Sequence, residues 1–265
     1  MAQLSFANFT LAEYRQLLAY FKRSHEYVTF SEVDPRSTSS PKLILLRHDI
    51  DYSLKQALEF ARLEADQGVR ATYFLLFSAP TYNLLDSANI GLPRQIAALG
   101  HEVGLHYDVA AMLQGNKSHP LDVLHAQARL LGELSGSPVR SIAMHNPSIS
   151  GADLFRSAPY VNAYDDRFTR AMSYYSDSCM AWRDSFVEAL AADAFPERVH
   201  LLIHPELWTA QRAPRFEKLE RVYADAQHEL AAGLLATREM WRRHGGVREH
   251  DRREAPVELL KKAAS

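Results

Sequence analysis

Apolar positions recur along the chain with two spacings, which predict alternating helices and strands. In residues 10–23 (TLAEYRQLLAYFKR), Tyr14, Leu17, Leu18 and Phe21 recur at helical spacing, and Thr10 with a glutamate three residues on marks the helix start. Similar patterns predict helices at 54–67, which ends at a glycine, at 92–99, at 121–134 and at 215–243. Short continuous apolar runs predict buried strands at 43–46, 71–77, 101–106, 141–145 and 199–204.

The order of these elements predicts the fold class. Strands that alternate with helices at short spacing are typical of a parallel α/β sheet, closed as a barrel or doubly wound. A chain of 265 residues can form this sheet in one domain, so we expect a single domain over 1–265, with a C-terminal helix at about 215–243 and a mobile tail at 246–265.

Four of the predicted strands end on a histidine or an aspartate, in the segments LILLRHDID, HEVGLH, SIAMH and VHLLIH. Because the carboxyl ends of parallel strands meet on one face, we expect Asp49, Asp51, His106, His145 and His204 to come together. A single histidine at a strand end is commonly a hydrogen-bonded structural residue. Five titratable residues at the same end of four strands instead indicate a metal site with an acid and a base beside it.

Asp49 and Asp51 are two positions apart and therefore lie on the same side of an extended strand. They could share one cation, or one could act as a base while the other binds a metal. His48 points to the opposite side, where a packing role is expected.

The segments RHDID and GHEVGLH resemble the first two motifs of the polysaccharide deacetylases, the NodB-like carbohydrate esterases of family 4, in the form RHD-x-D. The resemblance implies that Asp49 is the general base and that Asp51 and His106 bind the metal. LLIHPELW resembles the fifth motif, which implies that His204 is the general acid. The resemblance covers about residues 43–208 and implies a distorted (β/α) barrel of about seven strands.

One residue departs from this pattern. The family carries a second metal-binding histidine four residues after the first, where this chain has Ala110. His145 and Asp108 are the candidates for the missing ligand. The segment YYSDSCMAW resembles a fourth motif, which implies that Asp177 and Trp182 orient groups around the site.

Four aromatic residues near the predicted site could stack on a sugar ring, although packing in the core is the alternative for each. They are Tyr52, Tyr107, Trp182 and Trp208.

Charge and composition narrow the class of protein. Lys and Arg total 30 and Asp and Glu total 32, so the net charge of −2 argues against nucleic-acid binding. The single cysteine, the lack of a signal-peptide pattern and the absence of an apolar run of about 20 residues predict a cytoplasmic protein without a membrane span.

Together these features predict a zinc-dependent enzyme, with cobalt as a possible metal, that removes the acetyl group from an N-acetylated sugar. The resemblance implies a nucleotide-linked or lipid-linked sugar of surface-polysaccharide biosynthesis, as in the O-antigen of lipopolysaccharide. One alternative is a carbohydrate-binding pseudoenzyme that has lost its metal with the ligand replaced by Ala110.

Two other enzyme classes also place acidic residues in this way. In a haloacid-dehalogenase-like phosphatase, Asp49 and Asp51 would form the Asp-x-Asp pair, and Asp165 and Asp166 the later acidic motif. An HD-type phosphohydrolase would use His48 and Asp49, but it requires that pair on a helix.

Overall fold

The computed structural model describes residues 5–33, 42–114, 118–147, 155–156 and 158–244. The chain divides into two compact units, Met1–Arg215 and Phe216–Ser265. The first contains the sheet and the candidate site, and the described part of the second is a helix. The predicted mobile tail at 246–265 lies outside the described residues.

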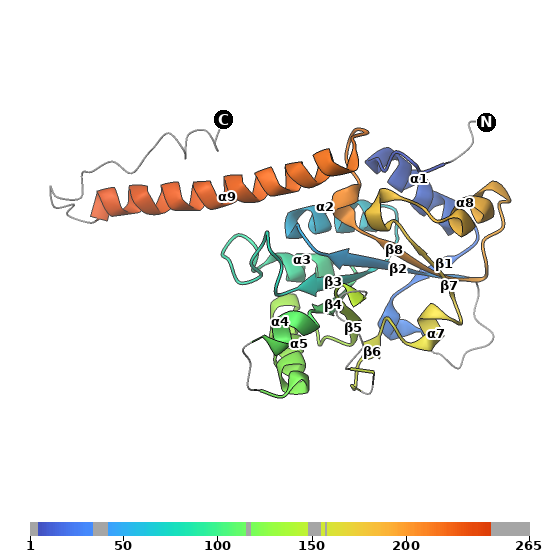
Figure 1. The fold of residues 1–265 in the computed structure, drawn as a ribbon, viewed down its shortest axis with the longest axis horizontal. Coiled ribbons are helices and arrows are strands. Elements are labelled where there is room, and N and C mark those ends of the chain that lie inside the picture. The colour runs from blue at the N-terminus through green and yellow to red at the C-terminus, as the bar shows by residue number, and fades with distance from the viewer. Residues whose placement is uncertain (1–4, 34–41, 115–117, 148–154, 157, 245–265) are drawn as a thin grey trace. The chain divides into compact units, whose positions relative to one another are not determined.

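The first unit is built on one parallel sheet (Figure 1). Seven strands follow in the order β6-β5-β4-β3-β2-β8-β7, and β1 pairs with the first half of β2. The strands are β1 (Glu26–Val28), β2 (Leu43–Ile50), β3 (Thr72–Leu76), β4 (Glu102–Tyr107), β5 (Ser141–Met144), β6 (Val161–Asn162), β7 (Ser173–Ser176) and β8 (Arg198–Ile203).

Most of the helices cover one face of this sheet (Figure 1). The helices described in the first unit are α1 (Leu11–Lys22), α2 (Leu54–Asp66), α3 (Leu92–Ala98), α4 (Val109–Leu113), α5 (Pro120–Ser135), α7 (Asp166–Thr169) and α8 (Asp184–Ala191). Short 3-10 turns are η1 (Phe30–Glu32), η2 (Ser178–Met180) and η3 (Pro205–Leu207). The predicted capping box at the start of α1 is present, because the Thr10 and Glu13 side chains each bond to the other residue's backbone N–H.

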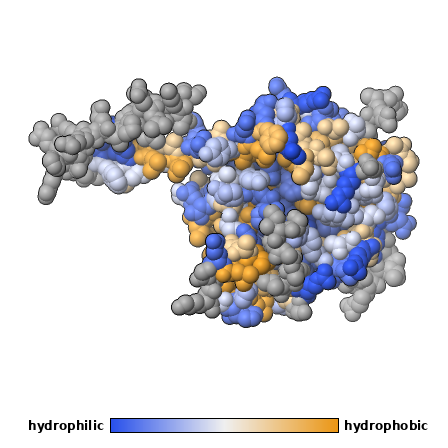
Figure 2. Space-filling model, in the orientation of Figure 1, coloured by the Kyte–Doolittle hydropathy of each residue, from blue (hydrophilic) through white to orange (hydrophobic). Residues whose placement is uncertain are grey.

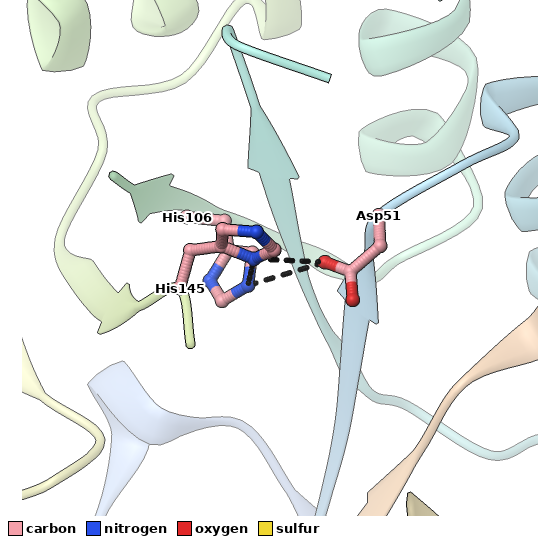
Figure 3. A group of neighbouring side chains, drawn as sticks. All are labelled: Asp51, His106 and His145. Atoms are coloured by element: carbon pink, nitrogen blue, oxygen red, sulfur yellow. Dashed lines mark hydrogen bonds and ion pairs between the residues drawn. The ribbon is translucent and has the colours of Figure 1, made fainter. Parts of the chain in front are cut away.

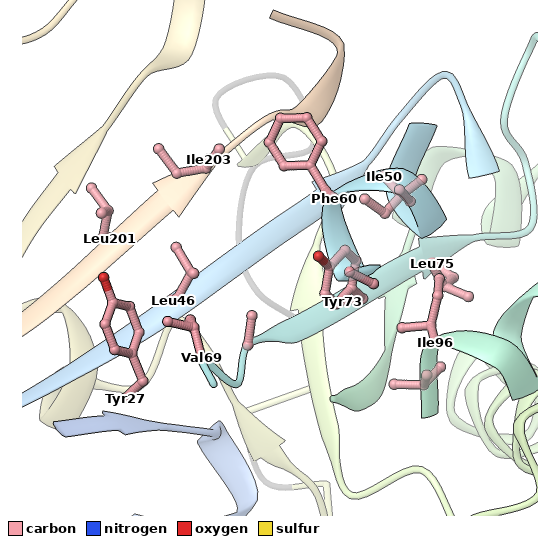
Figure 4. Close-up of a cluster of buried hydrophobic side chains, with 14 of the residues drawn as sticks. Tyr27, Leu46, Ile50, Phe60, Val69, Tyr73, Leu75, Ile96, Leu201 and Ile203 are labelled. Atoms are coloured by element: carbon pink, nitrogen blue, oxygen red, sulfur yellow. The ribbon is translucent and has the colours of Figure 1, made fainter. Parts of the chain in front are cut away.

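Side chains alternate between the two faces of each strand, and this alternation separates two cores. The outer face packs against α1, α2, α3, α5 and α8, and its strand residues include Leu46, Tyr73 and Ile203 (Figure 4). The inner face has a smaller apolar cluster that includes Leu45, Phe74 and Ala143. Polar residues follow this inner cluster toward the carboxyl ends of the strands.

The predicted α/β class is confirmed, and the series from β6 to β7 has the predicted seven strands, with β1 as an eighth beside β2. The sheet is curled into a half-barrel, and among the described strands β6 and β7 end the series without pairing to each other. The prediction missed β1, β6 and β7, which have four residues or fewer, because so few positions show no clear period. It also missed α4, α7 and α8.

The inner face is packed closely at Gly104 on β4. A β-carbon at this position would lie 2.6 Å from the Phe74 ring and 2.8 Å from Ser141 Oγ. We expect Gly104→Ala to lower the free energy of unfolding by about 1–3 kcal/mol, because the fully buried ring must move. Urea denaturation measures this change. Gly233→Ala is the control, since within the described part of the chain no atom outside the local helix backbone lies within 4 Å of its added methyl group. An equal loss in both variants would contradict the packing argument.

The second unit contains α9 (Arg215–His244), a little longer than the helix predicted at 215–243. Its apolar side chains are not concentrated enough for a membrane: none of the helices in the described ranges is both long and apolar enough to cross one. Figure 2 shows hydrophilic and hydrophobic side chains interspersed over the face in view.

Candidate metal centre

Inner-face residues from four strands meet at the carboxyl edge of the sheet. His106 lies near the end of β4, while Asp51, His145 and His204 follow β2, β5 and β8. Residues of β2 with odd numbers point to the inner face, so Asp49 and Asp51 lie on the same side, as the sequence predicts. The strand order β5-β4-β3-β2-β8 brings these residues together.

Three of these side chains form a tight cluster (Figure 3). Asp51 Oδ1 lies 3.4 Å from His106 Nε2 and 3.3 Å from His145 Nδ1. The two imidazole nitrogens are 3.3 Å apart. The three atoms therefore form a nearly equilateral triangle.

This triangle has the size expected of a metal site. In tetrahedral zinc coordination with bonds of about 2.0–2.1 Å, neighbouring ligand atoms are about 3.3–3.4 Å apart. Asp51 Oδ1 is buried, and no donor among the described residues makes a well-aligned hydrogen bond to it. One carboxylate and two imidazoles are ligands that divalent transition metals prefer. The residues thus fit a divalent cation.

The surroundings orient both imidazoles. His106 Nδ1 donates to the carbonyl of Ala143 at 3.0 Å, which leaves the lone pair of Nε2 directed at the cluster. Nε2 of His145 lies 2.9 Å from the side-chain amide of Asn146, whose φ of 46° turns the chain directly after the histidine.

Asp49 lies beside the cluster but is held by a different partner. Arg47 Nε and Nη2 each donate to one Asp49 oxygen at 2.7 Å, and both side chains are buried. Burial raises the pKa of the Asp49 carboxyl, but the Arg47 guanidinium and His106 outweigh it and hold this pKa below its usual range. Asp49 is therefore an ionised carboxylate, and its closest partner is Arg47 rather than the two histidines of the cluster.

Arg47 was not among the residues predicted for the site. A signal was present, because Arg47 and Asp49 are two positions apart on one strand and must share a face. Arg47 also donates from Nη2 to the hydroxyl of Tyr164 at 3.0 Å, a contact that no sequence pattern marks.

His204 is anchored by Asp177. His204 Nδ1 lies 2.7 Å from Asp177 Oδ1, and the His204 backbone N–H also donates to this carboxylate. Trp208 Nε1 donates to Asp177 Oδ2 at 2.8 Å. Burial lowers the pKa of His204, but Asp177 more than compensates and raises this pKa to about 10. The imidazolium form is therefore favoured at neutral pH.

A further carboxyl group, Glu206, was not predicted from the sequence. It is buried in η3, two residues after His204. The pKa of Glu206 is raised to about 8, mainly by burial. The charge of His204 lowers this pKa, whereas Asp51 and Asp177 raise it. The sequence around Glu206 does not predict that this residue is buried, because its burial depends on the 3-10 turn η3.

The structure separates the two candidates for the missing ligand. His145 lies in the cluster, whereas Asp108 caps α4, where it accepts from Ala111 N at 3.1 Å and from Ser78 Oγ at 3.0 Å. Ala110 is an exposed residue of α4.

Two of the aromatic residues predicted to contact a sugar, Tyr107 and Trp208, lie in the core, which corrects those two predictions. Tyr107 follows His106 and therefore points to the outer face, where it is buried against Phe155. Trp208 is also fully buried, and its indole is bonded to Asp177. Half-buried Trp182 stacks on Phe9 and Phe186.

The other residues of the alternative enzyme classes do not join the cluster. His48 and Asp49 point to opposite faces of β2, so they do not form the metal-binding pair of an HD-type site. Asp165 and Asp166 lie at the start of α7, in ion pairs with Arg167 and Arg170.

No protein-family model matches this chain. A search of curated proteins finds no match either. Among solved structures, a carbohydrate esterase family 4 (CE4) pseudoenzyme from Bacillus anthracis is 16% identical, with a TM-score of 0.44. The match covers 74% of this chain and 63% of the pseudoenzyme, so this chain spans less than two thirds of its length.

Two other solved structures are similar at the same level. The CE4 domain of a multidomain xylanase from the hindgut metagenome of Trinervitermes trinervoides is 15% identical, with a TM-score of 0.40, over 73% of this chain and 85% of the domain. The peptidoglycan deacetylase PdaC of Bacillus subtilis is 16% identical, with a TM-score of 0.39, over 80% of this chain and 100% of PdaC. Similarities at this level do not assign an activity to this chain.

Proposed function

We propose that this chain is a metal-dependent hydrolase that removes the acetyl group from an N-acetylated sugar. The observation that carries the proposal is the triangle formed by side-chain atoms of Asp51, His106 and His145, which we call the ligand triangle. It lies at the carboxyl edge of the sheet, where Asp49 and His204 also lie. The environments of Asp49 and His204 favour opposite protonation states, which is the arrangement that a base and an acid need. The resemblance of RHDID, GHEVGLH and LLIHPELW to deacetylase motifs supports the same function.

Each group has one role in this hydrolysis. A bound divalent cation, zinc in this proposal, supplies Lewis acidity toward the acetamide carbonyl and water oxygens. Asp49 accepts a proton from the water that attacks the carbonyl carbon. His204, whose Nδ1 is held by Asp177, donates its Nε2 proton to the nitrogen as the C–N bond breaks. The products are acetate and an amino sugar.

The proposed substrate is a sugar attached to a carrier. The RHD-x-D motif supports a nucleotide-linked or lipid-linked sugar of surface-polysaccharide biosynthesis, such as that of an O-antigen. The composition supports a cytoplasmic reaction. The test is acetate release from nucleotide-linked and lipid-linked N-acetyl sugars, and release from neither class by the zinc-loaded protein would contradict the proposal.

A carbohydrate-binding pseudoenzyme is the second candidate, and Ala110 is the observation that favours it. The fold offers His145 in place of the missing histidine. The two candidates therefore differ in whether His145 binds metal.

We expect the wild-type protein to bind one zinc ion, and His145→Ala to weaken this binding by more than about a hundredfold, since loss of even an indirect partner costs about 10- to 100-fold. Asp51→Ala and His106→Ala should have the same effect. Calorimetric titration with zinc, and the absorption spectrum with cobalt, measure it. Asp108→Ala is the matched control, since this nearby carboxylate caps α4. Unchanged zinc affinity in His145→Ala would contradict the three-ligand site.

A further inference from the structure

A second polar cluster lies on the outer face of β2, behind the candidate site. Its centre is an ion pair between His48 Nε2 and Glu64 Oε1 at 2.7 Å, and neither side chain is exposed. Glu64 belongs to α2, and it also accepts hydrogen bonds from the hydroxyl groups of Tyr14 and Tyr73. A buried ion pair is expensive to desolvate, and an apolar pair would commonly be as stable. Core stability therefore does not explain this cluster.

The contacts of the His48 imidazole reach two neighbouring elements. Both ring nitrogens of His48 face oxygen acceptors, the Glu64 carboxylate and the backbone carbonyl of Ile203, which is 3.1 Å from Nδ1. The His48 imidazole therefore bridges α2 and β8. Burial raises the pKa of Glu64, but His48 outweighs it and holds this pKa below its usual range.

The contact with Ile203 links this cluster to the site. Ile203 is the last residue of β8, and His204 follows it. In the sheet, Ile203 is the register partner of His48, so His204 lies beside Asp49. The imidazole of His48 therefore ties the carboxyl end of β8 to that of β2, at the point where the candidate acid and base leave their strands.

We propose that His48, held by Glu64, is a positioning residue that fixes His204 relative to Asp49. This inference rests on the proposed function for its effect on turnover. The contacts that join His48 to Glu64 and to Ile203 do not depend on that function. His48 takes no part in the contact between Asp177 and His204. Loss of the hydrogen bond between His48 and Ile203 should therefore move His204 together with Asp177, relative to Asp49.

The test compares a double variant with a matched control in the full-length protein. His48→Leu with Glu64→Gln removes both charges together, so that neither is left buried without its partner. Tyr73→Phe removes a 2.7 Å hydrogen bond to Glu64 but leaves the contact between His48 and Ile203. We expect the double variant to lower kcat by about 10- to 100-fold, because small displacements of reacting groups have effects of this size.

Other readouts separate positioning from a general structural role. In the double variant, KM, zinc affinity and the alkaline limb of the pH profile should stay at their wild-type values, while Tyr73→Phe should keep the wild-type kcat. A wild-type kcat in the folded, zinc-loaded double variant would overturn the proposal. An equal loss of kcat in Tyr73→Phe would also overturn it.

Amide hydrogen exchange tests the link without any substrate. We expect the amides of Ile203 and His204 to exchange about tenfold faster in the double variant than in Tyr73→Phe, which corresponds to the loss of one hydrogen bond. Unchanged exchange would refute the link, even if the wild-type protein hydrolyses no N-acetyl sugar. Absence of deacetylation with faster exchange would refute only the proposed function.

Discussion

Replacement of Asp49 by asparagine is expected to lower kcat by about 10²- to 10⁴-fold while one zinc ion still binds. Asparagine has nearly the same shape but cannot accept the proton of the attacking water. The Asp49 carboxylate is paired with Arg47 and lies 3.7 Å from His106 Nε2, beyond the ligand triangle. Its loss should therefore stop the chemistry and leave the metal in place. Steady-state kinetics with a parallel zinc titration measure both effects.

The same substitution disturbs a buried ion pair, and this effect must be separated from catalysis. Arg47 would keep a buried charge with only a neutral partner, so the free energy of unfolding should fall by up to about 3–5 kcal/mol. Kinetics are therefore measured where denaturation curves show the variant to be folded, with Asp108→Asn as the control for a nearby carboxylate. A wild-type kcat would exclude Asp49 as the base. Loss of zinc would instead make Asp49 a metal ligand.

Replacement of Asp177 by asparagine is expected to shift the alkaline limb of the pH profile of kcat to lower pH by several units. In the wild-type protein Asp177 raises the pKa of His204 to about 10, so the acid stays protonated through neutral pH. Without this carboxylate, burial lowers the pKa of His204, and activity should be lost as pH rises through neutrality. Profiles of kcat at equal zinc loading measure the shift. An unmoved alkaline limb would exclude His204 as the acid.

The same pair predicts how stability depends on pH. The pKa of His204 is higher in the folded protein than its ordinary value of 6.5, so its stabilising contribution is complete below about pH 6.5 and is lost as pH rises toward 10. Asp177→Asn should remove this part of the dependence. Trp208→Phe is the control, because it removes a donor to Asp177 but keeps the carboxylate beside His204.

Much of the site could be predicted from the chain because its residues occupy strand ends. Apolar runs mark the buried strands, and parallel strands bring their carboxyl ends to one edge. This is enough to select Asp49, Asp51, His106, His145 and His204 before any coordinates are known. Because side chains alternate along a strand, the sequence also predicts that His48 points to the face of β2 opposite to Asp49.

The two-residue period of a strand also applies to the aromatic residues. Tyr107 follows His106 and therefore had to face the helices, as the structure shows. The Arg47–Asp49 pair follows from the same rule. These two features were readable from the sequence.

The sequence by itself determined the parallel α/β class, the strands that carry the site and the residue types at their ends, because these depend on local patterns of apolar and polar positions. The tertiary structure decided which residues meet. His145 rather than Asp108 lies in the triangle with Asp51 and His106 because β5 lies next to β4, while Asp108 is used to cap α4. The pairs His204–Asp177 and His48–Glu64 join residues 27 and 16 positions apart, and each depends on how a strand packs against its neighbours rather than on any local spacing.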